Sequence, residues 1–246
     1  MPAATLLRQT PFPTSSFNME FDILNRGVFV IWQLTVRVIL KLVCRLEVSG
    51  RENIPPHGSY ILVSNHSSHL DTLCLLGLVP LSRISETYAA AAEDHFFINR
   101  WKANIVNRLF HAVPFCRIKT RETHQSLRLC KQLLSTSDRT LIFFPEGQRS
   151  RDGVLQPFKR GIGYLLASTH VNVIPVYIQG AHDAWPKGNI FPKPGKLLAV
   201  IGRPLNFSNA VRTSRSYSSI AQIIEQQLKT LIKSNTLCGE YCEKST

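Results

Sequence analysis

The feature that most constrains the fold is an alternation of short apolar runs with longer segments of helical periodicity. The strand-like runs are Tyr60–Ser64, Arg139–Gly147, Val171–Ile178 and Lys196–Gly202. The clearest helical segments are Glu122–Ser135 and Ser218–Ile232. Strands that alternate with helices form α/β domains with a mainly parallel central sheet flanked by helices. We expect one such domain over residues 48–246, with functional groups at the strand ends.

Two segments precede this domain. Residues 1–20 are rich in Ser, Thr and Pro and carry few charges, so we expect a disordered tail or a targeting leader. Residues 21–47 contain an apolar run after which Arg37, Lys41 and Arg45 recur every four residues. On a helix these cations share one flank, and aliphatic and aromatic side chains occupy the other. The pattern predicts an amphipathic helical segment.

We expect this amphipathic segment to be membrane-associated, lying in the interface with its cations toward anionic headgroups. Its apolar run is interrupted too early for the ~20 residues of a spanning helix. Two alternatives remain open on the sequence. The helix could pack on the protein core, or it could belong to a membrane-embedded helical pair.

The net charge of +13 predicts an anionic partner, such as membrane lipid, a phosphorylated substrate or nucleic acid. No nucleic-acid recognition motif and no P-loop occur, so we expect no nucleic-acid partner. The six cysteines form no CxxC pair, and no secretory signal is evident. We therefore expect reduced thiols and a membrane-associated protein whose active site faces the cytoplasm.

The stretch "SNHSSHLDT", Ser64–Thr72, directly follows the apolar run Tyr60–Val63 and carries the first candidate site. A tight turn would bring Asp71 onto one nitrogen of the His66 ring, leaving the other nitrogen free to take a proton. A metal site built on His66, His69 and Asp71 is the weaker hypothesis, because no second ligand cluster supports it, and we expect none. A polar turn without chemistry is the remaining alternative.

A second candidate site lies in "FFPEGQRSRDG", Phe143–Gly153, where the strand expected within Arg139–Gly147 ends in a loop. The guanidinium of Arg149 matches phosphate oxygens, and Gly147 lets backbone N–H groups approach an anion. Glu146 could bind a substrate hydroxyl or hold an arginine in place. The next segment, "PFKRG", adds two cations. The pattern indicates a phosphate-binding loop.

Together these stretches resemble the glycerolipid acyltransferase family of the 1-acyl-sn-glycerol-3-phosphate (lysophosphatidic acid) acyltransferase type. The resemblance rests on an HxxxxD motif, an arginine-ended block, an FPEG motif and a hydrophobic-Pro-Val block, in the family's order. They are His66–Asp71, His111–Arg117, Phe144–Ser150 and Val173–Ile178. Gln148 stands where the family more often has threonine, and His111 stands where glycine is frequent. These departures concern the acceptor more than the reaction.

The resemblance implies that residues 48–246 form an acyltransferase domain. It implies transfer of a fatty acyl group from acyl-CoA or acyl-carrier protein to a glycerophosphate hydroxyl, most often giving phosphatidic acid, with no metal or cofactor. His66 would be the general base and Asp71 would orient it; Arg117, Glu146, Gly147 and Arg149 would bind the acceptor, and Pro175 would shape the acyl region. Two alternatives are a lysophospholipid acyltransferase and a non-catalytic lipid-binding module. The sequence leaves the oligomeric state open.

Overall fold

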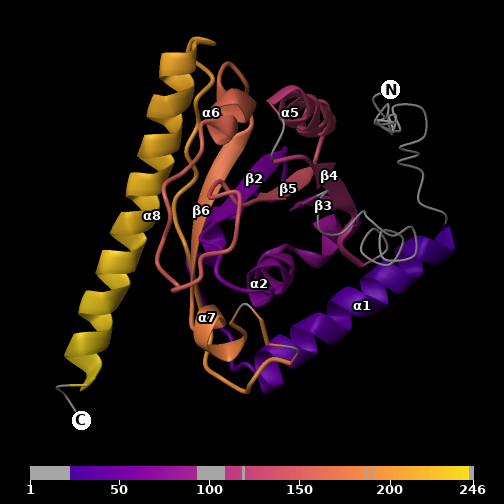
Figure 1. Ribbon diagram of the computed structural model, residues 1–246. Coiled ribbons are helices and arrows are strands. Elements are labelled where there is room, and N and C mark those ends of the chain that lie inside the picture. Colours follow the sequence, from indigo (N-terminus) through magenta and orange to yellow (C-terminus); the bar gives the residue numbers. More distant parts are fainter. Residues whose placement is uncertain (1–22, 93–108, 118–119, 187, 190, 244–246) are drawn as a thin grey trace, which may run out of the picture.

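The computed structural model describes residues 23–92, 109–117, 120–186, 188–189 and 191–243. The expected tail at residues 1–20 lies outside these described residues. The described chain forms a seven-stranded sheet with helices on both faces (Figure 1). The strand order is β1-β7-β6-β2-β5-β3-β4, so β2 lies at the centre.

Five neighbouring strands, β6, β2, β5, β3 and β4, run parallel, whereas β7 and β1 run parallel to each other and antiparallel to those five. Their bounds are β1 Glu47–Ser49, β2 Tyr60–Ser64, β3 Thr87–Ala92, β4 Ala112–Phe115, β5 Thr140–Phe143, β6 Asn172–Gln179 and β7 Leu198–Ile201. The mainly parallel α/β sheet expected from the sequence is therefore confirmed. Because β2, β5 and β6 are parallel neighbours, their carboxyl ends meet at one edge of the sheet.

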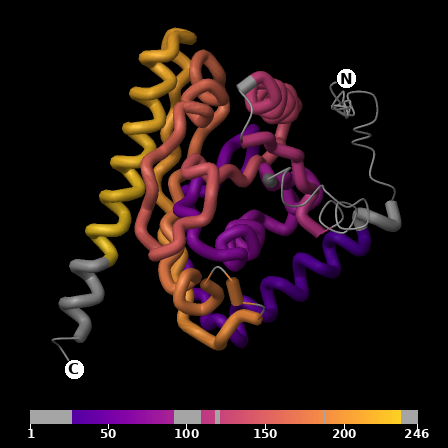
Figure 2. The backbone as a smooth tube through the Cα atoms, viewed as in Figure 1, coloured from indigo at the N-terminus to yellow at the C-terminus, as the bar shows by residue number. Residues whose placement is uncertain are grey.

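The helices divide between the two faces of the sheet (Figure 2). On one face α1 and α2 pack together with α7, and on the other face α5, α6 and α8 pack together. The helix bounds are α1 Ile23–Leu42, α2 Leu70–Leu78, α5 Thr120–Leu134, α6 Gly161–Leu166, α7 Ala181–Ala184 and α8 Ser214–Glu243. Two short 3-10 helices are η1 Arg51–Asn53 and η2 Leu81–Glu86.

The central strand β2 is covered on both of its faces. Tyr60 and Leu62 join the core beneath α1 and α2, whereas Ile61 and Val63 join the core beneath α5, α6 and α8. All four side chains are fully buried. Strands of a parallel sheet covered on both faces are expected to be apolar throughout, which explains the uninterrupted apolar run in this part of the sequence.

Helix α1 is present where the sequence predicts an amphipathic helix, but part of its polar flank faces the protein. The Gln33 side chain is fully buried. The half-buried Arg37 guanidinium donates hydrogen bonds to the carbonyl oxygens of Leu76 and Val79, at the carboxyl end of α2. An arginine satisfies the unpaired carbonyls of a helix end in this way. The expectation that Arg37 faces lipid headgroups is therefore wrong.

The outer face of α1 is apolar instead. Ile31 is 67% exposed and Leu42 is 71% exposed. The other exposed apolar side chains of this face are Val28, Leu34, Val38, Ile39 and Val43. Among the described residues, no helix combines the length and the apolar character needed to cross a membrane.

Candidate functional site

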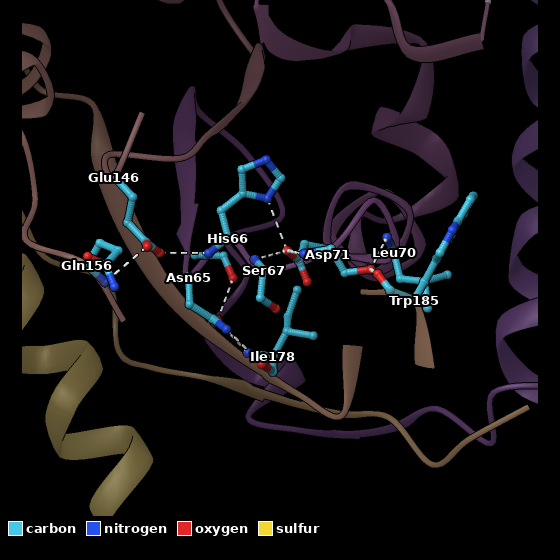
Figure 3. Close-up of polar contacts among 11 residues, drawn as sticks. Asn65, His66, Ser67, Leu70, Asp71, Glu146, Gln156, Ile178 and Trp185 are labelled. Atoms are coloured by element: carbon cyan, nitrogen blue, oxygen red, sulfur yellow. Dashed lines mark hydrogen bonds and ion pairs between the residues drawn. The ribbon is translucent and has the colours of Figure 1, made fainter. Parts of the chain in front are cut away.

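The site begins where β2 ends, at a residue that the sequence reasoning did not select. The Asn65 amide nitrogen donates to the carbonyl oxygen of Ile178, and its amide oxygen accepts from the N–H of Ile178, both at 2.9 Å (Figure 3). The buried side chain thus continues the pairing between β2 and β6 by one more residue. This contact fixes the position at which the chain leaves the sheet, directly before His66.

The structure brings His66 and Asp71 together as the sequence predicted. The His66 Nδ1 atom lies 3.0 Å from Asp71 Oδ2 (Figure 3). The same oxygen accepts hydrogen bonds from the backbone N–H groups of Ser67 and Ser68, both at 2.7 Å. Asp71 is fully buried, whereas 18% of the His66 side chain is exposed. A buried carboxylate therefore fixes a partly accessible imidazole.

This geometry determines which imidazole nitrogen can act as a base. A carboxylate only accepts hydrogen bonds, so the proton of a neutral His66 ring lies on Nδ1, facing Asp71. The lone pair then belongs to Nε2, on the far side of the ring. The ring itself stacks on Phe144, with centroids 3.9 Å apart and planes 15° apart. Both contacts restrict the ring to one orientation.

The FPEG loop holds the backbone of His66. Glu146 accepts a hydrogen bond from the His66 N–H at 2.7 Å and another from the Gln156 N–H at 3.0 Å (Figure 3). The Ser150 N–H also donates to the carbonyl oxygen of His66 at 2.8 Å. Glu146 is 3% exposed, and this burial raises its pKa to about 7, although the two N–H contacts oppose the shift. Both carboxylate oxygens are thus engaged by the backbone, so we assign Glu146 a positioning role rather than the acceptor contact expected from the sequence.

Three cations and a glycine meet beside this loop. The Arg117 guanidinium donates to the carbonyl oxygen of Gly147 at 2.8 Å. Gly147 has a φ of 75°, and a Cβ atom there would lie 2.7 Å from Lys159 Nζ, so only glycine fits comfortably. Burial lowers the pKa of Arg149, Asp71 opposes this shift, and Arg117 adds to it. Arg149 lines the same cavity as Arg117, Gly147 and Lys159. We call Arg117, Gly147, Arg149 and Lys159 the cationic cluster.

His66 and the cationic cluster line the same cavity, whose volume is about 1350 Å³. The lining of this cavity also includes apolar side chains, among them Trp32 from α1, Leu73 from α2 and Phe110. A site with a base, cations and apolar side chains can bind a molecule that has a phosphate at one end and a hydrocarbon chain at the other. Among the described residues, no three or more His, Cys, Asp or Glu side chains gather as metal ligands.

Pro175 is the predicted site residue that the structure places elsewhere. It lies within β6, buried, opposite Val63 of β2. Its carbonyl oxygen accepts a hydrogen bond from the Gly202 N–H at 2.8 Å, and its ring would contact any Cβ added at Gly202. It does not line the cavity. The expectation that Pro175 shapes the acyl region is therefore replaced by a role in packing β6 against β7.

Comparison with known proteins identifies the family. The family model described as Acyltransferase matches residues 45–179, more than half of the chain. The chain belongs to the acyltransferase family. The matched segment contains every predicted site residue, from His66 to Pro175. It also contains the four sequence blocks on which the family resemblance rests.

Several curated relatives in this family carry the name 1-acyl-sn-glycerol-3-phosphate acyltransferase. The protein from Limnanthes douglasii is 28% identical over 183 residues, covering 73% of this chain and 58% of the relative. The mouse alpha enzyme is 27% identical over 209 residues, covering 81% of this chain and 69% of the relative. The chain thus spans about 58% of the length of the plant relative.

A solved structure of the same family has the same fold. It is the crystal structure of the 1-acyl-sn-glycerophosphate (LPA) acyltransferase PlsC from Thermotoga maritima, with a TM-score of 0.64 and 25% identity. The match covers 85% of this chain and 79% of that chain. The α/β architecture described above is therefore shared with this solved member of the family.

Two residues at this site were not predicted from the sequence. Asn65 could have been found from its place between the last residue of a buried strand and the candidate base. Lys159 stood out only as one of two cations in "PFKRG", and nothing in the sequence said which of them reaches the FPEG loop. The structure selects Lys159, because its backbone N–H donates to the carbonyl oxygen of Pro145 at 2.9 Å and its Nζ lies against Gly147.

Proposed function

We propose that this protein transfers a fatty acyl group from a thioester donor to the free hydroxyl of 1-acyl-sn-glycerol-3-phosphate, giving phosphatidic acid. The observation that carries the proposal is the His66 ring, which is held by buried Asp71 and lines a cavity together with the cationic cluster and apolar side chains. The named relatives favour the same acceptor.

In the proposed reaction, Nε2 of His66 removes the proton of the acceptor hydroxyl while the oxygen attacks the thioester carbonyl. Asp71 stabilises the imidazolium that forms. The tetrahedral intermediate collapses, the carbon–sulfur bond breaks, and the thiolate takes the proton back from His66. Protons and charges balance, and both substrates together with His66 and Asp71 supply every group that reacts.

The cationic cluster would bind the phosphate of the acceptor. A phosphate monoester carries about −1.5 to −2 charges at neutral pH, and Arg117, Arg149 and Lys159 offset that charge. Glu146 would act through His66 by fixing its backbone. The acyl chains would lie against the apolar side chains of Trp32, Leu73 and Phe110.

The acceptor and product are lipids, so we propose that α1 rests on a membrane, on the cytoplasmic side. Its exposed apolar face would enter the lipid, and the exposed Lys41 and Arg45 would reach anionic headgroups. Trp32 lies on α1 and also lines the cavity. A lipid could therefore pass from the membrane to His66 along α1.

The test is an assay with purified protein, vesicles containing acyl acceptors, and a labelled acyl donor, with products identified by mass. The acceptor panel contains lysophosphatidic acid and headgroup-bearing lysophospholipids. His66→Ala should lower turnover by ~10²–10⁴-fold, the range of general-base catalysis, with an unchanged melting temperature. The matched control is His57→Ala, an exposed histidine in the loop before β2.

Two results would contradict the proposal. If the turnover of His66→Ala stayed within twofold of that of the unchanged protein, His66 would not be the general base. A lack of product with every acceptor, while vesicles still bind, would indicate a lipid-binding module. Preferred acylation of a headgroup-bearing acceptor would move the function to the lysophospholipid class.

A further inference from the structure

A second cavity lies at the carboxyl end of α1, and its volume is about 410 Å³. Of the described residues, none lines both this cavity and the cavity at His66. Its lining comes from the end of α1 and from the segment that precedes β7: Leu42, Val43, Arg45, Pro194, Gly195 and Lys196. The second cavity therefore takes no part in the proposed chemistry at His66.

The 191–196 segment is held against α1 and α7 by backbone hydrogen bonds. Directly after this segment, the N–H of Leu197 donates to the carbonyl oxygen of Cys44 at 2.9 Å. The N–H of Lys193 donates to the carbonyl oxygen of Ala184, in α7, at 2.7 Å. Figures 1 and 2 show this segment beside the carboxyl end of α1. Two stretches of chain that are tied together thus form the second cavity.

Large apolar side chains are exposed at this cavity. Leu42 is 71% exposed, Val43 is 47% exposed and Phe191 is 79% exposed. Phe191 stands three residues before Pro194, so its Cα lies within about 11 Å of a residue of the lining. Exposed apolar patches with polar residues around them mark sites that interact with a membrane or with another protein. A second segment therefore adds apolar surface to the exposed face of α1.

Cations accompany this apolar surface. Four exposed cations stand on the two stretches of chain: Lys41, Arg45, Lys193 and Lys196. The exposed Glu47 forms an ion pair with Lys196 at 2.9 Å and offsets one of the four charges. The sequence contains no acid in residues 23–46 or in residues 185–197. The surface is therefore complementary to an anionic partner.

We propose that the second cavity binds the headgroup phosphate of an anionic phospholipid, and that the 191–196 segment is a membrane contact in addition to α1. The inference rests on the proposed function, in which α1 rests on a membrane. Arg45 and Lys196, one from each stretch of the lining, supply the positive charge for the phosphate. Phe191 enters the hydrocarbon region beside Leu42.

Two contacts orient the catalytic cavity toward the lipid. A single amphipathic helix can roll about its own axis on a membrane, whereas a helix and a second contact cannot. Trp32, on α1, and Trp185, six residues before Phe191, both line the cavity at His66. The Ser68 hydroxyl donates to the carbonyl oxygen of Trp185 at 2.7 Å, so the turn that follows His66 is tied to this part of the chain. The second contact thus keeps the entrance to His66 against the membrane.

An anionic lipid surface fits these residues better than an acidic protein does. The exposed apolar side chains of α1 run from Val28 to Val43. A partner must therefore cover about 22 Å of helix as well as the 191–196 segment. A lipid surface covers both without a matching shape, and the acceptor of the proposed reaction is itself a lipid.

The first test measures cosedimentation with phosphatidylcholine vesicles that contain or lack phosphatidylglycerol. The double variant Arg45→Gln/Lys196→Gln should bind the anionic vesicles about 25-fold more weakly, because each cation near an anionic surface contributes about fivefold. Its binding to neutral vesicles should not change. Phe191→Ser should bind both kinds of vesicle about 10-fold more weakly, because the inserted ring is lost in either case. Unchanged vesicle binding by these variants would overturn the proposal.

Matched controls lie at α8, on the face of the sheet opposite α1. Arg215→Gln/Lys229→Gln removes two exposed cations, of which Lys229, like Lys196, is paired with a glutamate. Val211→Ser removes an exposed aliphatic side chain. Both controls should bind vesicles within twofold of the unchanged protein. Losses equal to those of the test variants would show attraction over the whole surface and would overturn the proposal.

A further variant separates this contact from that of α1. Ile31→Ser changes an exposed residue in the middle of α1. Vesicle binding that depends on Ile31, but not on Phe191 or the two cations, would overturn this inference and leave the proposed contact of α1. If the double variant lost affinity for an acidic carrier protein but not for vesicles, the surface would belong to a protein partner, and the proposal would be wrong.

The second test is kinetic and uses a short-chain lysophosphatidic acid and a short-chain acyl-CoA, both dissolved as monomers. Phe191→Ser and the double variant should turn over these substrates as the unchanged protein does. Their apparent KM for lysophosphatidic acid in anionic vesicles should rise by the factor by which binding weakens. Slower turnover of the dissolved substrates would place the changes in the catalytic cavity and overturn the proposal. Vesicle binding that depends on these residues, without acyl transfer by the unchanged protein, would refute the proposed function but not the membrane contact.

Discussion

Asp71→Asn separates the charge of the buried carboxylate from its hydrogen bonds. In the structure, Asp71 Oδ2 accepts from the His66 ring at 3.0 Å and from the N–H groups of Ser67 and Ser68 at 2.7 Å each. Three donors converge on this one oxygen, so an asparagine must place its carbonyl oxygen there. The variant should therefore keep the loop and the ring orientation while it loses the negative charge.

The expected loss of activity follows from the distance between the two groups. A unit charge about 4 Å from an imidazolium contributes roughly 4 kcal/mol at an effective dielectric constant of about 20. Only the imidazolium formed during proton transfer is stabilised by this interaction, so removing the charge of Asp71 raises the activation free energy of the acyl-transfer step. A change of about 4 kcal/mol lowers kcat by ~10³-fold.

The stability cost should be smaller than the catalytic cost. Among the described residues, Asp71 Oδ1 has no hydrogen-bond partner, so the new amide nitrogen would be buried without an acceptor. One such group costs about 1–3 kcal/mol. Asp71→Ala should cost more, because two buried backbone N–H groups would then also lose their acceptor. The exposed Asp183 provides a matched control, as Asp183→Asn.

The assay combines steady-state turnover, with lysophosphatidic acid and palmitoyl-CoA, and urea unfolding of the same samples. The free energy of unfolding of Asp71→Asn should lie within about 3 kcal/mol of that of the unchanged protein, and its kcat should be ~10³-fold lower. Turnover within tenfold of the unchanged protein would show that the charge of Asp71 does not act on His66. If Asp71→Asn lowered the free energy of unfolding as much as Asp71→Ala does, the substitution would have changed the loop and not only the charge.

Two further variants test the positioning of the loop and the packing of the helices. Burial raises the pKa of Glu146 in the folded protein to about 7, above its ordinary value, so the native state binds this proton more tightly than the unfolded state does. The free energy of unfolding should therefore fall by about 1–3 kcal/mol as the pH rises from about 4.5 to 7. Glu146→Gln should remove this pH dependence from melting curves, and an unaltered dependence would contradict the assignment. A Cβ at Gly163 would lie 2.1 Å from the carbonyl oxygen of Tyr217, so Gly163→Ala should lower the free energy of unfolding by about 1–3 kcal/mol. Gly161→Ala is its control, since a Cβ there meets Leu127 at an ordinary 3.5 Å; equal stability of the two variants would refute the close contact of α6 with α8.

The order of short apolar runs and helical segments was enough to determine the sheet. Runs such as Ile61–Val63 are apolar at every position because both faces of a parallel sheet are covered. Parallel neighbours end at the same edge, so polar residues that follow β2 and β5 must lie near each other. For this reason the sequence alone placed His66, Asp71 and the FPEG loop in one site.

Only the tertiary structure decided which way each side chain faces. Periodicity records which residues of α1 are apolar, but it does not say whether an apolar flank meets protein or the outside; Arg37 turned inward because the end of α2 offered it carbonyl oxygens. Glu146 and Pro175 lie in sequence blocks that suggest substrate contacts, yet backbone N–H groups engage the first and the sheet encloses the second. Such choices depend on partners distant in the chain, and a local pattern carries no record of them.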